Sequence, residues 1–147
     1  MTSKSKVYFF FDKTKIVLKD RLRLKSVIGT LFKKEKKELL SLNFIFCTDE
    51  TLLRINQQFL NHDFYTDIVT FSYSGNKNHI VGEAYISVNR VRENATNLKT
   101  SIGEELLRVI FHGALHLCGY GDKSTSATKK MRDKENFYIA MMKNRST

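Results

Sequence analysis

Short apolar runs alternate with longer amphipathic segments in the first half of the chain. Residues 7–11 (VYFFF) and 42–47 (LNFIFC) are apolar runs of strand length. Between them, across 20–37, apolar residues recur at intervals of three and four, the spacing of a helix that buries one face. Thr48 then precedes a second stretch of helical spacing at 49–61, in the position of an N-cap. The first half therefore predicts strand, helix, strand, helix.

The second half begins with two strand patterns and ends with three helical ones. Residues 66–74 alternate apolar and polar side chains, and 81–88 form another apolar run after the turn sequence SGNKN. Three helical segments follow, at about 87–98, 101–117 and 126–142. The predicted order is β-α-β-α-β-β-α-α-α, an α+β fold in which a small mixed β-sheet is covered by helices.

The length and composition of the chain are those of a single domain. It contains 147 residues, no internal repeat, no low-complexity stretch, no proline and only seven glycines, so nothing in it resembles a linker. We therefore expect residues 1–147 to form one domain with one main core.

Membrane insertion and secretion are not expected. The longest apolar runs fall far short of the roughly 20 residues that a membrane-spanning helix requires, and the N-terminus lacks the pattern of a signal peptide. Cys47 and Cys118 have no C-x-x-C partner, so both are predicted to be buried thiols without chemistry, and Cys118 to face the core. These features favour a cytoplasmic protein with no membrane partner.

The segment 101–117 carries the polar residues of greatest interest. It begins with the Ser–Glu spacing of a capping box and is apolar around most of its circumference, which predicts a buried, central helix. One polar stripe crosses it at steps of three and four residues: Ser101, Glu105, Arg108, His112 and His116. Two of the four histidines in the chain therefore share one face of its most apolar helix. A buried polar group without a partner is costly, so this stripe indicates a functional site.

The sequence HGALHLCGYGD at 112–122 has the spacing of a metal site. Residues four apart on a helix project in the same direction, so His112 and His116 can bind one ion. Gly119 follows the predicted helix end, where a left-handed residue reverses the chain and can return Asp122 to the same ion. Two nitrogens and one oxygen leave a position for water, as in catalytic zinc sites. We predict one Zn²⁺ per chain.

Gly113 occupies the position at which an H-E-x-x-H metalloprotease carries its general base. Peptide hydrolysis by that route is disfavoured unless Glu83, Glu105 or Glu135 replaces the base in space. Phosphodiester cleavage demands less, because a metal ion can activate water and also stabilise the charge that develops on a phosphate. One hypothesis is that Gly113 leaves room above the ion for an incoming phosphate.

The charge of the chain is concentrated at its two ends. Residues 1–37 contain 12 Lys/Arg and 3 Asp/Glu, and residues 123–147 contain 7 and 2, whereas residues 38–122 contain 6 and 10. A single lysine-rich run is usually a solvated helix face, but two such runs in one small chain favour a polyanionic partner: RNA, DNA or a ribosome.

Three motifs together resemble the YbeY family of bacterial ribosome-maturation endoribonucleases. They are HGALHLCGY at 112–120 with Met131 and Glu135 downstream, YTDIVTFSY at 65–73, and GEAYIS at 82–87. The resemblance covers about residues 40–140. It implies an α+β metalloprotein that cleaves single-stranded RNA with zinc, matures the 3′ end of small-subunit rRNA and takes part in ribosome quality control, with rRNA, the small subunit and assembly proteins as partners.

Two positions depart from the family pattern. The common third ligand of the family is histidine, and Asp122 occupies that position here; aspartate also binds zinc well. The family arginine thought to contact RNA is replaced by Leu60, which continues the apolar face of its helix. His62, Arg108 and Lys123 are the candidates for substrate contact in its place.

Two alternatives to the endoribonuclease remain open on sequence alone. One is an RNA-binding ribosome-assembly factor whose metal is structural, which the missing arginine favours. The other is a metal-dependent hydrolase of another substrate, including peptides. More remotely, two histidines and one aspartate also describe the metal triad of non-haem iron oxygenases. A carboxylate beside the metal would favour a protease, and a basic groove leading to it would favour RNA.

Overall fold

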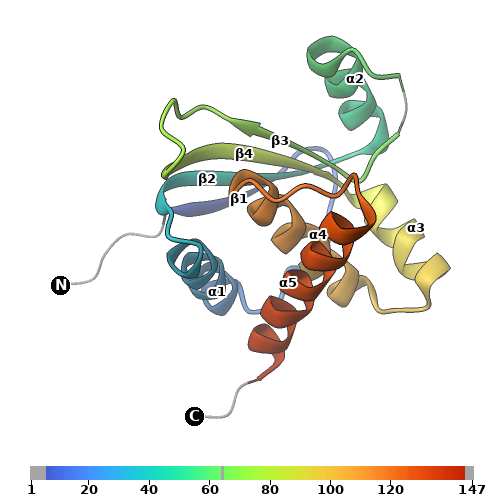
Figure 1. The fold of residues 1–147 in the computed structure, drawn as a ribbon. Helices are drawn as coiled ribbons and strands as arrows, with labels where there is room; N and C mark the ends of the chain where they lie inside the picture. The colour runs from blue at the N-terminus through green and yellow to red at the C-terminus, as the bar shows by residue number, and fades with distance from the viewer. Residues whose placement is uncertain (1–5, 64, 145–147) are drawn as a thin grey trace.

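The computed structural model describes residues 6–63 and 65–144 and has the predicted order of elements (Figure 1). The strands and helices are β1 (Val7–Phe11), α1 (Arg21–Lys34), β2 (Glu38–Cys47), α2 (Asp49–Leu60), β3 (Ile68–Ser72), β4 (His79–Ser87), α3 (Val88–Leu98), α4 (Ile102–Leu117) and α5 (Thr125–Lys143). The α+β class predicted from the hydrophobic pattern is therefore confirmed.

The four strands form one mixed sheet in the order β1-β2-β4-β3. β2 is parallel to both β1 and β4, and β3 is antiparallel to β4. β2 is longer than predicted because its first residues pair with the start of β4, as in Glu38 with His79, before an irregularity between Leu39 and Ser41. This irregularity interrupts the alternation from which strands are recognised, so the sequence pattern revealed only the regular part from Leu42 onward.

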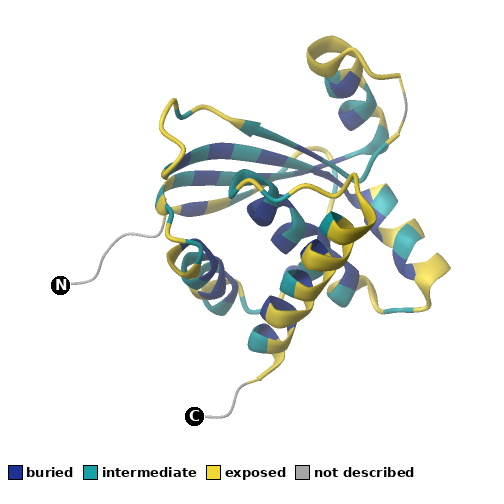
Figure 2. Ribbon diagram, viewed as in Figure 1, coloured by how far each residue is buried: buried dark blue, intermediate teal, exposed yellow. Residues whose placement is uncertain are grey.

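One face of the sheet is covered by helices. In Figure 1, α1, α4 and α5 lie together beneath the sheet, with α4 in the middle. From β2, the fully buried Leu42, Phe44 and Phe46 face these helices, and Ile110 and Phe111 of α4 are equally buried. Figure 2 shows this dark-blue layer between sheet and helices. The metal-site helix is thus central, as predicted.

The opposite face of the sheet is covered only at one end, by α2. A small second cluster lies there, made by Cys47, Leu52 and Val69. Most of α2 projects away from the sheet (Figures 1 and 2), and Phe59 and Leu60 are exposed. The sequence predicts that Leu60 continues the apolar face of its helix. That end of the face is exposed, although the ring of Phe59 meets that of Phe71 in β3 edge-on, with the ring centroids 5.9 Å apart.

Both cysteines are inert thiols. Cys47 is fully buried, and Cys118 is half-buried with its side chain packed against the main core, as predicted. Burial raises the pKa of each thiol to about 12, so neither is a thiolate at neutral pH. Across residues 6–63 and 65–144, no helix has the length and apolarity to span a membrane.

Candidate metal centre

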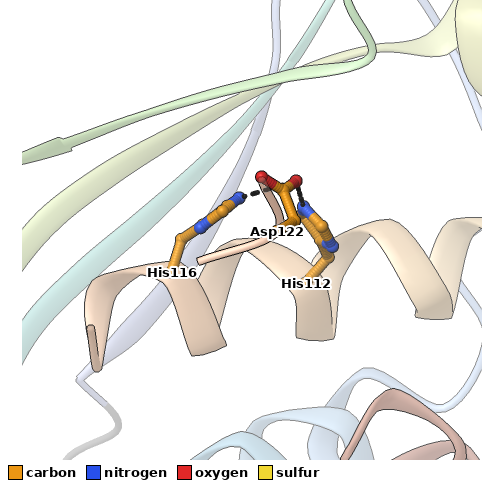
Figure 3. Close-up of side chains that lie close together, drawn as sticks. All are labelled: His112, His116 and Asp122. Carbon is orange, nitrogen blue, oxygen red and sulfur yellow. Dashed lines mark ion pairs between the residues drawn. The ribbon is translucent and has the colours of Figure 1, made fainter. Parts of the chain in front are cut away.

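The end of α4 places three polar side chains together. His112 and His116 lie one turn apart on the helix, whose N-cap Ser101 accepts a hydrogen bond from the backbone N–H of Glu104. After the helix the chain reverses at Gly119, which has a φ of 105°, a conformation that favours glycine. The reversal brings Asp122 back over the two histidines (Figure 3). The sequence prediction that these three residues converge is therefore matched by the geometry.

The three donor atoms have the spacing of a metal ligand set. The Nε2 atom of His112 lies 3.3 Å from Asp122 Oδ2, and that of His116 lies 3.6 Å from the same oxygen (Figure 3). Ligands at bond lengths near 2.0–2.1 Å from a tetrahedral ion lie about 3.4 Å from one another. The three donor atoms lie within 4.8 Å of one another, so one ion could bind between them after a modest approach of the side chains, and a fourth position would remain open.

Both imidazoles are held with Nε2 toward Asp122. The Nδ1 atom of His116 is 2.8 Å from the carbonyl oxygen of Tyr120, and that of His112 is 2.7 Å from Glu135 Oε2. A carbonyl oxygen only accepts, so Nδ1 of His116 donates, and its neutral ring carries the lone pair on Nε2. The carboxylate gives His112 the same tautomer. This arrangement, with the second nitrogen anchored, is the one found in metal-binding histidines.

Glu135 of α5 supports His112 from behind. Its side chain is buried, and its other oxygen accepts a hydrogen bond from Nη1 of Arg108 at 3.0 Å. The carboxylate therefore lies on the side of the imidazole opposite to the proposed ion. Glu135, one of the three glutamates that could have replaced the base, thus orients His112. Glu83, another of the three, lies on the outer face of the sheet, where its carboxylate accepts hydrogen bonds from the hydroxyls of Tyr73 and Tyr85.

A hollow of about 240 Å³ opens beside His112 and Asp122. Asp67, Glu105 and Arg108 contribute to its wall. Burial raises the pKa of Asp67, and the neighbouring Glu135 and Asp122 add to the rise against the opposing effect of His112. Burial likewise raises the pKa of Glu105, whose Oε1 is buried without a hydrogen-bond partner in the described part of the chain. The hollow is therefore rich in carboxylates that are poorly solvated.

The surroundings of His112 attract positive charge. Burial by itself lowers the pKa of this imidazole, but the hydrogen bond to Glu135 and the charges of Glu135, Asp67 and Asp122 outweigh it, and the pKa is raised. The surroundings thus stabilise the positively charged imidazolium form of His112. A divalent ion would satisfy the same negative surroundings, with the proton displaced from Nε2.

Gly113 does not have the predicted role. A Cβ atom at this position would lie 2.5 Å from Cδ1 of Ile68, 3.6 Å from Thr70 Cγ2 and 3.7 Å from Ala84 Cβ. The residue therefore faces β3 and β4 rather than the space above the ion. The hypothesis that it makes room for a phosphate is wrong; its lack of a side chain lets α4 approach the sheet closely.

The three candidates for substrate contact lie in different places. Arg108 is in the wall of the hollow, where its guanidinium is paired with Glu135. Lys123 follows Asp122 and borders a second hollow at the start of α5. His62 is exposed in the segment after α2 and does not line the hollow beside His112. The structure thus brings two of the three close to the candidate metal centre.

Asp67 lies inside the motif YTDIVTFSY, but the sequence did not predict that it would stand beside His112. It stands just before β3, and its backbone carbonyl accepts a hydrogen bond from the N–H of Ser87. Its sequence signals were its place in that motif and a charged side chain at the entrance to an apolar strand. Asp67 lies near His112 because β3 pairs with β4 and both strands pack against α4. These contacts join residues far apart in the sequence, so local patterns do not reveal them.

Comparisons with known proteins identify relatives along nearly the whole chain. The model of the family described as Endoribonuclease YbeY matches residues 11–143. Proteins named Endoribonuclease YbeY from Cytophaga hutchinsonii and Amoebophilus asiaticus are 44% and 39% identical, over 93% and 92% of this chain and 96% and 92% of their own. The solution structure of TM1509 from Thermotoga maritima superposes with a TM-score of 0.64 at 29% identity, covering 92% of this chain and 88% of that one.

Proposed function

Since the chain belongs to the YbeY family of endoribonucleases, we propose that it cleaves single-stranded RNA in rRNA processing. The observation that carries this proposal is the convergence of two anchored imidazoles and one carboxylate in a chain of this family. The proposed substrate is the 3′ end of small-subunit rRNA, and the proposed setting is cytoplasmic ribosome maturation and quality control. A peptide substrate is disfavoured because Gly113 stands where an H-E-x-x-H metalloprotease has its base and because Glu135 is used behind the imidazole of His112. Glu105, in the wall of the hollow, is the carboxylate that keeps a peptide hydrolase as the second candidate.

The proposed cofactor is one Zn²⁺ held by His112 Nε2, His116 Nε2 and Asp122. Bound there, zinc would supply an activated water and a Lewis acid for the phosphate oxygen. Two neutral imidazoles and one carboxylate carry a single negative charge in total. With Zn²⁺ bound, the centre would therefore keep one net positive charge, which suits an anionic substrate. Glu135 and the carbonyl of Tyr120 hold the two rings in place. The guanidinium of Arg108, in the wall of the hollow, is the nearest proposed contact for a phosphate.

The direct test is cleavage of an rRNA precursor. Zinc-loaded protein should shorten the 3′ end of a small-subunit precursor, whereas chelator-treated protein should not, and added zinc should restore the activity. A structural role of the metal predicts RNA binding without cleavage in the zinc-loaded and zinc-restored samples, and weaker binding after chelation. Casein hydrolysis by zinc-loaded protein, with RNA left intact, would instead support the alternative of a peptide hydrolase.

Electrostatic attraction should dominate RNA binding. The affinity for single-stranded RNA is expected to fall with salt along a log–log line whose slope is about −0.7 per phosphate contacted. Reversing the charges of Lys129, Lys130 and Arg132 together should weaken binding strongly and flatten this slope. Titrations at several salt concentrations measure both quantities. An affinity that is independent of salt, or one that the triple reversal leaves unchanged, would contradict this expectation.

Replacing Glu135 with glutamine should weaken zinc binding about ten- to hundredfold, the usual cost of losing an outer partner of a metal-bound histidine. The amide cannot provide the negative charge that His112 and Arg108 now share. Competition with a chromophoric chelator measures the affinity. Asp133→Asn is the matched control, because Asp133 lies on the same helix but, among the described residues, forms its ion pair with the exposed Lys129. Equal zinc affinities of the two variants would contradict the orienting role of Glu135.

A further inference from the structure

We propose that a groove across the N-terminal half of α5 binds the stretch of single-stranded RNA next to the cleaved bond, with one base stacked on Phe137. This groove, called the α5 groove below, is lined by Lys34, Lys123, Lys129, Lys130, Arg132, Lys134 and Phe137. The inference rests on the proposed function and adds the path of the substrate away from the metal.

The α5 groove is continuous with the hollow beside the candidate metal centre. A second hollow, of about 510 Å³, shares Thr128 and Arg132 with the first. A third, of about 530 Å³, shares Lys129 with the second and extends between α5 and the end of α1. Because each hollow shares at least one wall residue with the next, the three hollows adjoin one another from the candidate metal centre to the end of α1, and one extended strand can follow them.

Charge along the α5 groove fits a phosphate backbone. Its walls contain six cationic residues against the acidic Glu35 and Asp133, a net charge of +4. Asp133 pairs with Lys129, Glu35 pairs with Lys134, and Nη1 of Arg132 lies 4.0 Å from Glu135 Oε1, so Lys34, Lys123 and Lys130 carry most of the excess. The second hollow also lies at the N-terminus of a 19-residue helix, where the backbone dipoles favour an anion. Lys34, near the end of the first basic segment, thus lies in one groove with five basic residues of the second.

Phe137 has the setting of a stacking platform for a base. Its side chain is 50% exposed in the third hollow, and the ring is braced by the edge-on ring of Tyr138 at 5.0 Å. The ammonium of Lys34 lies 5.7 Å from the centre of the Phe137 ring. An exposed aromatic ring between cationic side chains is the combination with which proteins bind single strands. Among the described residues of α5, Phe137 is the one large apolar side chain that is exposed, which disfavours an apolar protein surface as the ligand.

The test uses zinc-loaded full-length protein and a short fluorescein-labelled oligouridylate with 2′-O-methyl riboses, which resists cleavage. Fluorescence anisotropy is measured over a range of salt concentrations. Lys130→Glu should weaken binding and reduce the salt slope by about 0.7, because one phosphate is then no longer neutralised by the protein. Phe137→Leu keeps an apolar side chain but removes the ring, and should weaken binding about five- to hundredfold with no change in slope. Phe137→Trp should retain wild-type affinity.

Two matched controls share the chemistry of these changes but lie outside the α5 groove. Phe10→Leu removes a ring of almost the same exposure, 49%, from β1 at the far edge of the sheet. Lys99→Glu reverses an exposed charge after α3. Both should bind like wild type. If Phe137→Leu binds like Phe10→Leu, or Lys130→Glu like Lys99→Glu, the α5 groove is not the RNA path.

The outcomes also separate this inference from the proposed function. Cleavage of rRNA precursor by wild type, combined with unaltered oligonucleotide binding by Lys130→Glu and Phe137→Leu, would overturn the α5 groove alone. Selective loss of binding in these variants, combined with no cleavage by zinc-loaded wild type, would support the groove and overturn the enzyme. Wild-type protein that does not bind the oligonucleotide at all would overturn the groove as well.

Discussion

His116→Ala is expected to cut RNA no faster than metal-stripped wild-type protein, a loss of more than about a hundredfold. The substitution removes one of three ligand atoms directly, which costs more than the ten- to hundredfold effect of disturbing an outer partner. The fold should survive, because the imidazole is half-exposed and its Nδ1 contacts only a turn carbonyl, that of Tyr120. Rates with a labelled single-stranded RNA, measured beside thermal unfolding, show whether activity is lost without loss of structure.

His79→Ala is the matched control for this loss. His79 lies at the start of β4 on the surface, 3.3 Å from a carboxylate oxygen of Glu38. Its replacement should leave the cleavage rate within about twofold of wild type, as is usual for a surface position. A folded His116→Ala protein that cleaves RNA as fast as His79→Ala would rule out a catalytic metal at this site.

Gly113→Glu is expected to unfold the protein or to lower its free energy of unfolding by about 3–5 kcal/mol. The new side chain would begin 2.5 Å from Ile68 Cδ1 and continue between α4 and the sheet, where its carboxylate would be buried without a partner. RNA cleavage and zinc binding should be lost together as a consequence of misfolding. Urea denaturation followed by circular dichroism measures the change in stability.

Gly103→Glu separates this packing effect from the general cost of changing a glycine in α4. Gly103 is exposed in the first turn of the same helix, and a Cβ atom there would have no neighbour within 4 Å. A glutamate near a helix N-terminus is favourable, so Gly103→Glu should be at least as stable as wild type. If Gly113→Glu is equally stable, α4 does not need a glycine against β3.

The parts of this protein that the sequence predicts correctly depend on local spacing. Strand and helix order follows from periodicity, and the N-cap of α4 follows from Ser101, although the Glu104 carboxylate accepts hydrogen bonds from Thr100 and Lys143 instead of completing a capping box. His112 and His116 converge because one helical turn separates them, and Asp122 returns because Gly119 adopts a positive φ. These relations involve residues within one or two turns, so no knowledge of the tertiary fold is needed.

What the sequence did not predict depends on contacts between distant elements. Glu135 supports His112 only because α5 packs against α4, and Asp67 reaches the hollow only because β3 pairs with β4. The close approach of Gly113 to Ile68 has the same origin. Lys34 of the first basic segment likewise joins the second in one groove because α1 and α5 lie side by side, an arrangement that charge counts do not reveal.

Crystals soaked in zinc, with diffraction recorded at the zinc absorption edge, test the metal centre most directly. We predict one anomalous peak per chain, about 2.0–2.2 Å from Nε2 of His112, Nε2 of His116 and a carboxylate oxygen of Asp122. The fourth position should hold water, and Nδ1 of His112 should remain bonded to Glu135. The absence of a peak between these three residues, or a peak of equal strength in His116→Ala crystals, would contradict the account.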